Sequence, residues 1–339
     1  MKPFTTWLLK AVAAFAVAFL LLSGFCYFYY NLPVHITNKS GATDYLWETN
    51  HFSSRGTEGY AAARTDKYGF VNTFPIKKDS VDILVMGSSH GEGFNVGAEE
   101  NFTYLLNKKL YDNHRDLYAY SICTSGHDLI RCVNNLDTAL KIYKPTKYIV
   151  METAGNVFSI DELKQLDAGQ ITPHKSYDSG MMFYLQKVDY FRLVYSQLYN
   201  ALNNASQQAI EPVESAPVAR TIDLEEYAVY LERMLARASK SAENAGCSLI
   251  IMYAPKLAID YSGNVLPQGN SAQEVLFSEL CEKYGITYIN MFNDFSEEYN
   301  NTLHLPHGFS NTAVGTGHTN KYGHARIAEA LYEHIENQR

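Results

Sequence analysis

Apolar residues beyond the N-terminal segment gather in short, nearly unbroken runs. Five runs lie at residues 83–86, 117–122, 148–151, 249–253 and 286–291. Runs of this length are typical of strands that are buried on both faces of a sheet. Stretches of helical character separate them, as in a parallel sheet built from strand–helix units. The pattern therefore predicts an α/β fold with a doubly wound, mostly parallel five-stranded sheet.

Three of the intervening helices can be placed closely. The helix predicted over residues 128–143 repeats leucine and valine at helical spacing, and Lys144-Pro145 stops it. A second is predicted over residues 224–245, with Gly246 placed as its C-terminal cap. The last, over residues 321–336, closes the chain.

The N-terminal segment has a different pattern. Residues 11–28 carry no charge, Lys2 and Lys10 precede them, and Tyr29 and Tyr30 follow. Eighteen apolar residues are enough to cross a bilayer, and lysines on the N-terminal side favour an N-terminus in the cytoplasm. We therefore expect residues 1–32 to be a cytoplasmic tip and transmembrane anchor, with the rest of the chain outside the cytoplasm. A cleaved signal peptide is the open alternative, although its apolar region is normally shorter.

The outer part divides into two predicted regions. Residues 33–80 are polar with scattered aromatic residues, and we interpret them as a partly ordered stalk or lead-in. Residues 81–339 form the predicted domain. An insertion at about 157–223 is too long for one crossover; we expect helices beside the sheet and a flexible loop over residues 206–217. It serves either as a lid or docking surface, or only as solvated decoration.

Charge and cysteine content exclude several classes of function. The chain has 28 basic and 36 acidic residues and no Lys/Arg run, so nucleic acid is not an expected partner. Four cysteines follow the apolar segment, and disulfides and buried free thiols both stay open. There is no CxxC pair, and the C-terminal histidines lack the spacing of a helical zinc motif. We expect neither a metal nor a cofactor, and we expect His127 at the surface.

A candidate nucleophile follows the first predicted strand. Gly87 to Gly91 match Gly-x-Ser-x-Gly, and Ser89 stands three residues beyond the strand, where a doubly wound sheet binds its ligands. A serine hydroxyl needs a base to take its proton and donors for the oxyanion that forms on attack.

In four separate blocks the sequence resembles the SGNH, or GDSL-like, hydrolases. The blocks are Gly87-Ser88-Ser89-His90, Gly126 after the second strand, Asn156 after the third, and His318 in the stretch 317–324. The resemblance spans residues 87–331 and implies an SGNH-hydrolase or flavodoxin-like fold. It also implies Ser89 as nucleophile and His318 as base. The oxyanion donors would be the N–H groups of Ser89 and Gly126 and the amide of Asn156, and His90 would shape the pocket.

The chain departs from the family pattern at one position. Many members carry an aspartate three residues before the catalytic histidine, where this sequence has Gly315. The acid of a serine triad fixes the tautomer and orientation of the imidazole. Asn311, Asp294 or a backbone carbonyl are the candidates to replace it, and a Ser-His dyad is the alternative.

A single membrane anchor with the catalytic domain outside is similar to the arrangement in bacterial SGNH-like proteins that add or remove O-acyl groups on cell-wall or exported polysaccharides. It implies an extracytoplasmic serine esterase or acyltransferase, an acylated glycan as substrate, and a multi-spanning acyltransferase as a candidate partner. Two alternatives stay open. One is an esterase for lipids or small esters, and the other is a non-catalytic carbohydrate-binding or scaffold module.

Overall fold

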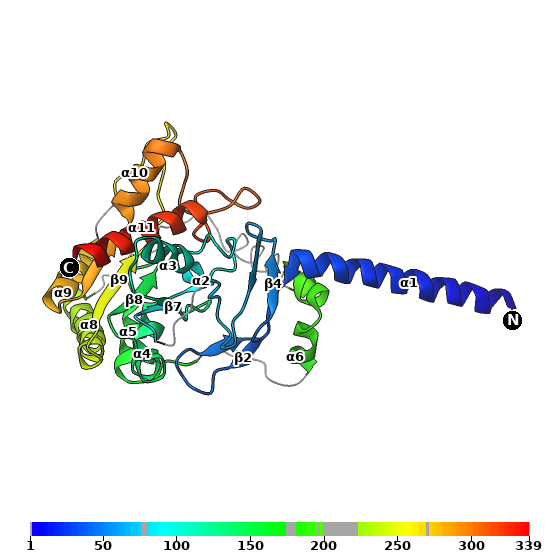
Figure 1. Cartoon of the computed structure of the whole chain (residues 1–339), viewed down its shortest axis with the longest axis horizontal. Helices are drawn as coiled ribbons and strands as arrows, with labels where there is room; N and C mark the ends of the chain where they lie inside the picture. The colour runs from blue at the N-terminus through cyan, green and yellow to red at the C-terminus, as the bar shows by residue number, and fades with distance from the viewer. Residues whose placement is uncertain are drawn as a thin grey trace.

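A five-stranded parallel sheet forms the centre of the molecule (Figure 1). The computed structural model describes residues 2–75, 80–173, 181–195, 197–198, 223–268 and 271–338. The strands are β6 (Ile83–Met86), β7 (Ala119–Ser121), β8 (Tyr148–Thr153), β9 (Ser248–Tyr253) and β10 (Thr287–Asn290), in the order β10-β9-β8-β6-β7. All pairings between them are parallel. The α/β fold predicted from the five apolar runs is confirmed.

Helices cover both faces of this sheet because its strands are apolar on both faces. Leu84 and Met86 of β6 pack into one core, and Ile83 and Val85 pack into the other. The helices on the first face are α4 (Leu129–Tyr143), α5 (Ile160–Asp167), α8 (Leu224–Asn244) and α9 (Ala272–Lys283). Those on the second are α3 (Phe102–Asp112), α10 (Phe292–Thr302) and α11 (Lys321–Asn337). The sheet is therefore doubly wound.

The three helices predicted from sequence are present, and local chemistry sets their ends. Asp128 caps α4 by accepting a hydrogen bond from the N–H of Arg131, and Lys144 ends it in the left-handed conformation, before Pro145. Gly246 follows α8 with φ of +70°, as a residue beyond a C-terminal cap often does. Asn320 caps α11.

The order of the strands decides where a ligand can bind. The chain runs from the inner strand β6 to the edge strand β7, and then returns to β8 on the other side of β6. In such sheets the crevice opens at the carboxyl ends of the strands where the direction of winding changes. Ser89 and the residues that follow β8 lie at these ends.

Residues 33–80 are more ordered than the stalk we expected. Their described part contains β2 (His35–Thr37), β3 (Tyr45–Trp47), β4 (Phe52–Arg55) and β5 (Ala61–Arg64). Strands β2 and β3 pair with each other, while β4 and β5 form an antiparallel sheet with β1 (Tyr30–Asn31). Tyr45 and Trp47 are buried in a small core with Phe94 from the domain. Figure 1 shows this segment between α1 and the central sheet.

Helix α1 (Lys2–Tyr29) extends away from the folded part (Figure 1). By length and composition it could cross a membrane, and almost none of it is buried. The insertion contributes α5, α6 (Met181–Gln186) and helical residues 189–195, whereas the predicted loop 206–217 lies outside the described residues. All five cysteines are buried free thiols, so the disulfide alternative is not what the structure has.

Candidate active site

Ser89 opens a single turn of helix directly after β6. Ser88 caps this turn, α2 (Ser89–Glu92), by accepting a hydrogen bond from the N–H of His90 at 3.2 Å. The buried carboxylate of Glu152, at the end of β8, accepts hydrogen bonds from the N–H and the hydroxyl of Ser88 at 2.9 and 3.0 Å. A Cβ at Gly87 would lie 2.7 Å from Glu152, so only glycine fits there. The hydrogen bonds from Ser88 to Glu152 therefore fix the turn that presents Ser89.

His318 lies within hydrogen-bonding distance of Ser89. The distance from His318 Nε2 to Ser89 Oγ is 2.8 Å. The histidine stands in the loop before α11, whose cap Asn320 also donates to the carbonyls of Leu305 and Gly308. Contacts of Thr319 with His90 hold the loop close to the turn that follows β6. The structure thus brings the predicted nucleophile and base together.

The carboxylate that orients His318 comes from Glu58, in the segment predicted as a stalk. Glu58 Oε2 accepts a hydrogen bond from His318 Nδ1 at 2.7 Å, and Oε1 accepts one from the backbone N–H of His318 at 2.8 Å. A Cβ at Gly317 would lie 2.4 Å from Oε1, and Gly317 has φ of +77°, so glycine permits this approach. Glu58 supplies the carboxylate that the sequence lacks at Gly315.

The orienting groups predicted from the sequence lie elsewhere, and that prediction is corrected. Asp294 pairs with Arg326 on α11, at 3.3 Å. Asn311 accepts a hydrogen bond from the N–H of Gly59 at 2.8 Å and donates to the carbonyls of Gly56 and Gly59. Asn311 therefore holds the turn that carries Glu58, and acts on His318 only through it.

Glu58 keeps its negative charge over a wide range of pH. Burial raises the pKa of this carboxyl group, but the hydrogen bonds and charge of His318, helped by the charge of Arg55, lower the pKa to about 2. The Arg55 guanidinium lies 3.8 Å away. A carboxylate in this position stabilises the imidazolium that forms when His318 takes a proton.

His90 forms one wall of the site. Its Nδ1 accepts a hydrogen bond from the N–H of Thr319 at 3.2 Å and lies 2.9 Å from the Thr319 hydroxyl. Burial, with the nearby charges of His318 and Lys256, lowers the pKa of His90 to about 3, so its ring is neutral near pH 7. The ring centre lies 5.0 Å from that of His318.

A pocket of about 360 Å³ opens beside Ser89. Ser88, His90 and Gly126 line it together with Thr153, Gly155, Val157 and Phe158, among others. The predicted donor Asn156 is not in this lining. Its side chain is buried, and its amide donates to the hydroxyl of Tyr288 at 3.0 Å. The structure therefore does not support Asn156 as an oxyanion donor.

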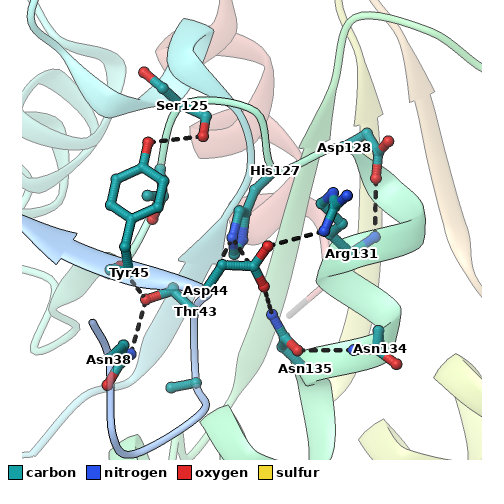
Figure 2. Close-up of polar contacts among 12 residues, drawn as sticks. Asn38, Thr43, Asp44, Tyr45, Ser125, His127, Asp128, Arg131, Asn134 and Asn135 are labelled. Atoms are coloured by element: carbon teal, nitrogen blue, oxygen red, sulfur yellow. Dashed lines mark hydrogen bonds and ion pairs between the residues drawn. The ribbon is translucent and has the colours of Figure 1, made fainter. Parts of the chain in front are cut away.

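The loop that carries Gly126 is held by the segment before the domain (Figure 2). The Tyr45 hydroxyl donates to the carbonyl of Ser125 at 2.8 Å, and the N–H of Asp44 donates to His127 Nε2 at 3.1 Å. His127 is buried, contrary to our expectation of a surface residue. The Asp44 carboxylate also pairs with Arg131 on α4, at 2.8 Å. These contacts fix the loop between the domain and the segment 33–80.

Glu92, the last residue of α2, completes this support. Its buried carboxylate accepts hydrogen bonds from the indole of Trp47 and from the N–H and hydroxyl of Ser125. Sequence reasoning missed Glu58, Glu92 and Glu152 as site residues. Glu152 and Glu92 stand close to the Asn156 and Ser89 blocks, whereas no local signal marks Glu58.

We expect the free energy of unfolding of the Asp44→Asn variant to be lower than that of the wild type by about 1–3 kcal/mol. The change leaves Arg131 without its charged partner in a nearly buried site. Urea denaturation measures the change. The control is Asp167→Asn, whose exposed pair with Arg233 is worth less than about 1 kcal/mol. Equal effects of the two variants would contradict the role assigned to Asp44.

No model of a known protein family matches the chain, and neither does any curated protein. Solved structures are similar to it in fold. A psychrotrophic esterase from Pseudoalteromonas sp. shares 15% identity with a TM-score of 0.41, over 76% of this chain and 97% of its own. A GDSL-like lipase from Parabacteroides merdae shares 11% identity with a TM-score of 0.38, over 77% of this chain and 98% of its own. An acetyl xylan esterase shares 11% identity with a TM-score of 0.39, over 75% of this chain and 99% of its own.

Proposed function

We propose that this protein cleaves or transfers acyl esters through a covalent acyl-Ser89 intermediate. The observation that carries the proposal is the hydrogen-bonded chain Ser89–His318–Glu58, with donor–acceptor distances of 2.8 and 2.7 Å. Serine, histidine and carboxylate in this order activate the hydroxyl for attack on a carbonyl carbon. Ser89, the group that attacks, lines a pocket that can receive the ester.

The reaction proceeds in two half-reactions. Ser89 Oγ attacks the ester carbonyl and its proton passes to His318 Nε2. The bond to the alcohol then breaks, and the alcohol leaves with the proton from His318. In the second half, water or a sugar hydroxyl attacks the acyl carbon, gives its proton to His318, and Ser89 recovers its hydrogen. Water completes an esterase, and a sugar hydroxyl completes an acyltransferase.

The negative charge on the carbonyl oxygen needs donors in the pocket. We assign this role to the N–H groups of Ser89 and Gly126. The first residue of a helix has no acceptor for its N–H within the helix, which favours Ser89 at the start of α2. The contacts of Tyr45, Glu92 and Asp44 with the Gly126 loop support a fixed position for the second donor.

The size and lining of the pocket favour a short acyl group such as acetyl. At about 360 Å³ it is modest. Serine, threonine and glycine line it along with Val157 and Phe158, and the acidic residues Asp128 and Glu162 also lie in the lining. We propose an O-acylated cell-wall or exported polysaccharide as substrate and a position outside the cytoplasm. The apolar helix α1 supports this location, because it could tether the site to a membrane at the cell surface or in the periplasm.

The two alternative functions have less support. An esterase for long-chain lipids needs a larger apolar groove beside the serine than this pocket offers. A non-catalytic scaffold was suggested by the absence of an acid at Gly315. Glu58 supplies an acid at hydrogen-bonding distance, which favours catalysis.

Serine-directed phosphonate labelling tests the proposal. The full-length protein is incubated with an alkyl fluorophosphonate and the adduct is located by mass spectrometry, alongside assays of p-nitrophenyl acetate and an acetylated oligosaccharide. We expect one adduct, on Ser89, with loss of acetyl-ester turnover in proportion to labelling.

The control is Ser310→Ala, which removes a hydroxyl from an exposed loop and should label and turn over as the wild type does. An unlabelled Ser89 together with unchanged turnover in Ser89→Ala would overturn the proposal. Release of free acetate identifies an esterase, and acetate found on an added glycan identifies a transferase.

A further inference from the structure

The helical part of the insertion carries an apolar stripe on its surface. It comprises α6 and the helical residues 189–195 and 197–198, which are called the insertion helices. The exposed apolar side chains are Met181, Tyr184, Phe191, Val194, Tyr195 and Leu198, each at least 45% exposed. Positions 191, 194, 195 and 198 follow the spacing of one helix face, and positions 181 and 184 are three residues apart in the separate helix α6. Contiguous exposed apolar surface of this kind marks a contact with a partner or a membrane.

The insertion helices lie against α1. The rings of Tyr190 and Phe19 meet edge to face, with 5.8 Å between their centres. The guanidinium of Arg192 donates to the carbonyls of Leu32 and Gln186, which joins the end of the anchor to the insertion. Figure 1 shows α6 beside the end of α1 that meets the folded part.

The ring contact between Tyr190 and Phe19 lies well inside the apolar part of α1. Phe19 lies ten residues before Tyr29, the last residue of α1, which is about 15 Å along the helix at 1.5 Å per residue. It is also in the middle of the apolar run 11–28. A side chain that touches Phe19 therefore reaches the depth of the acyl chains wherever this run crosses a bilayer about 30 Å thick.

We propose that the insertion helices enter the membrane beside α1, with their apolar stripe against lipid acyl chains. The inference rests on the membrane placement of α1 proposed above. The segment has three described charged residues, and the acidic one, Asp189, is close enough to Arg192 for the two charges to attract. Arg192 points to carbonyls at the end of the anchor, and the Lys187 ammonium lies 4.6 Å from the ring of Phe183. Long basic side chains of interfacial helices reach toward the membrane surface in this way.

The bilayer is a better occupant for this stripe than a soluble protein. The stripe continues the exposed surface of α1. Only 6% of the most apolar window of α1 is buried. The same lipid that covers α1 would cover its neighbour. Two contacts with the membrane, in place of one, would then fix the orientation of the folded part relative to the bilayer.

Fluorescence quenching by brominated lipid tests the inference in the full-length protein. The wild type has two tryptophans, Trp7 on α1 and Trp47 in the folded part. In a Trp7→Phe background, Phe191→Trp places a probe on the stripe, and Tyr184→Trp is a second probe should the first misfold. The matched control is Tyr261→Trp, a fully exposed position on a loop joined to α10, far from α1. Each protein is reconstituted in vesicles of dioleoyl phosphatidylcholine, with and without its dibrominated analogue, and the Trp7→Phe signal is subtracted.

We expect bromine to lower the fluorescence of the Phe191→Trp probe by a fraction similar to that for Trp7, and to leave the Tyr261→Trp probe unchanged. Quenching of Trp7 without quenching at 191 and 184 would overturn the inference while leaving the anchor in place. An unquenched stripe that cross-links to a second copy would reassign it as an interface between copies. Failure to quench Trp7 would remove the anchor and the inference together, and none of these outcomes bears on labelling of Ser89.

Discussion

The Glu58→Gln variant should lose about 10²- to 10⁴-fold in kcat/KM for an acetyl ester. Both carboxylate oxygens of Glu58 accept hydrogen bonds from His318, one from the backbone N–H and one from Nδ1. An amide has only one oxygen, so its NH2 group must face one of these donors. If it faces the ring, Nδ1 becomes the acceptor and Nε2 carries the proton. His318 then cannot take the proton from Ser89. Steady-state kinetics measures the loss.

Two controls separate this effect from a general disturbance of the segment. Glu48→Gln removes a partly exposed carboxylate from the same segment, where it pairs with His51, and should change kcat/KM by less than about twofold. Glu58→Asp retains two acceptors and should recover part of the activity. An unchanged rate in Glu58→Gln would show that Glu58 does not orient the base.

The same variant has a signature in the pH dependence of stability. The folded pKa of Glu58 is about 2, below its ordinary value of 4.5. A depressed carboxyl pKa contributes stability that is fully present above 4.5 and is lost as pH falls toward 2. The difference in unfolding free energy between wild type and Glu58→Gln should therefore shrink over this interval, as measured by denaturation at several pH values.

The Ser89→Ala and His318→Ala variants should each lose about 10⁴- to 10⁶-fold in kcat. Alanine at 89 removes the atom that forms the acyl bond, and alanine at 318 leaves the Ser89 proton without an acceptor. Because the groups act as a unit, the double variant should be no slower than the worse single variant. Burst and steady-state assays of p-nitrophenyl acetate measure both effects.

The control for the histidine change is His304→Ala, in the same C-terminal stretch. His304 is exposed and its ring stacks on Tyr322, 3.8 Å between centres. We expect it to keep its activity within about twofold, since an exposed substitution away from the site disturbs little. Additive losses in the Ser89 and His318 double variant would contradict a shared mechanism.

Much of the sheet and part of the site could be predicted because their signals are local. A buried parallel strand needs four to six apolar residues in succession, and the five runs carry that requirement in their own sequence. Ser89 stands in a Gly-x-Ser-x-Gly turn, and His318 precedes a capped helix. Each of these features can be recognised within ten residues.

Glu58 could not be predicted because it acts at a distance of 260 residues along the chain. Only the folded antiparallel segment β4–β5, and the Asn311 side chain that binds Gly56 and Gly59, bring it to His318. The role predicted for Asn156 was not supported because its local sequence signal does not show what its side chain contacts. Asn156 follows a strand end as expected, but its amide donates to the partly buried hydroxyl of Tyr288. This contact depends on the sheet order, in which β9 separates β8 from β10.

The spacing of the triad along the chain also bears on when activity first appears. Glu58 and Ser89, the proposed acid and nucleophile, come early in the chain, and His318, the proposed base, follows Ser89 by 229 residues. Synthesis proceeds from the N-terminus, and domains fold as their residues emerge. A nascent molecule would therefore carry Glu58 and Ser89 through the synthesis of the residues up to 318 without a base between them. Acyl transfer could begin only once His318 had been delivered, so products truncated before this residue would be inert.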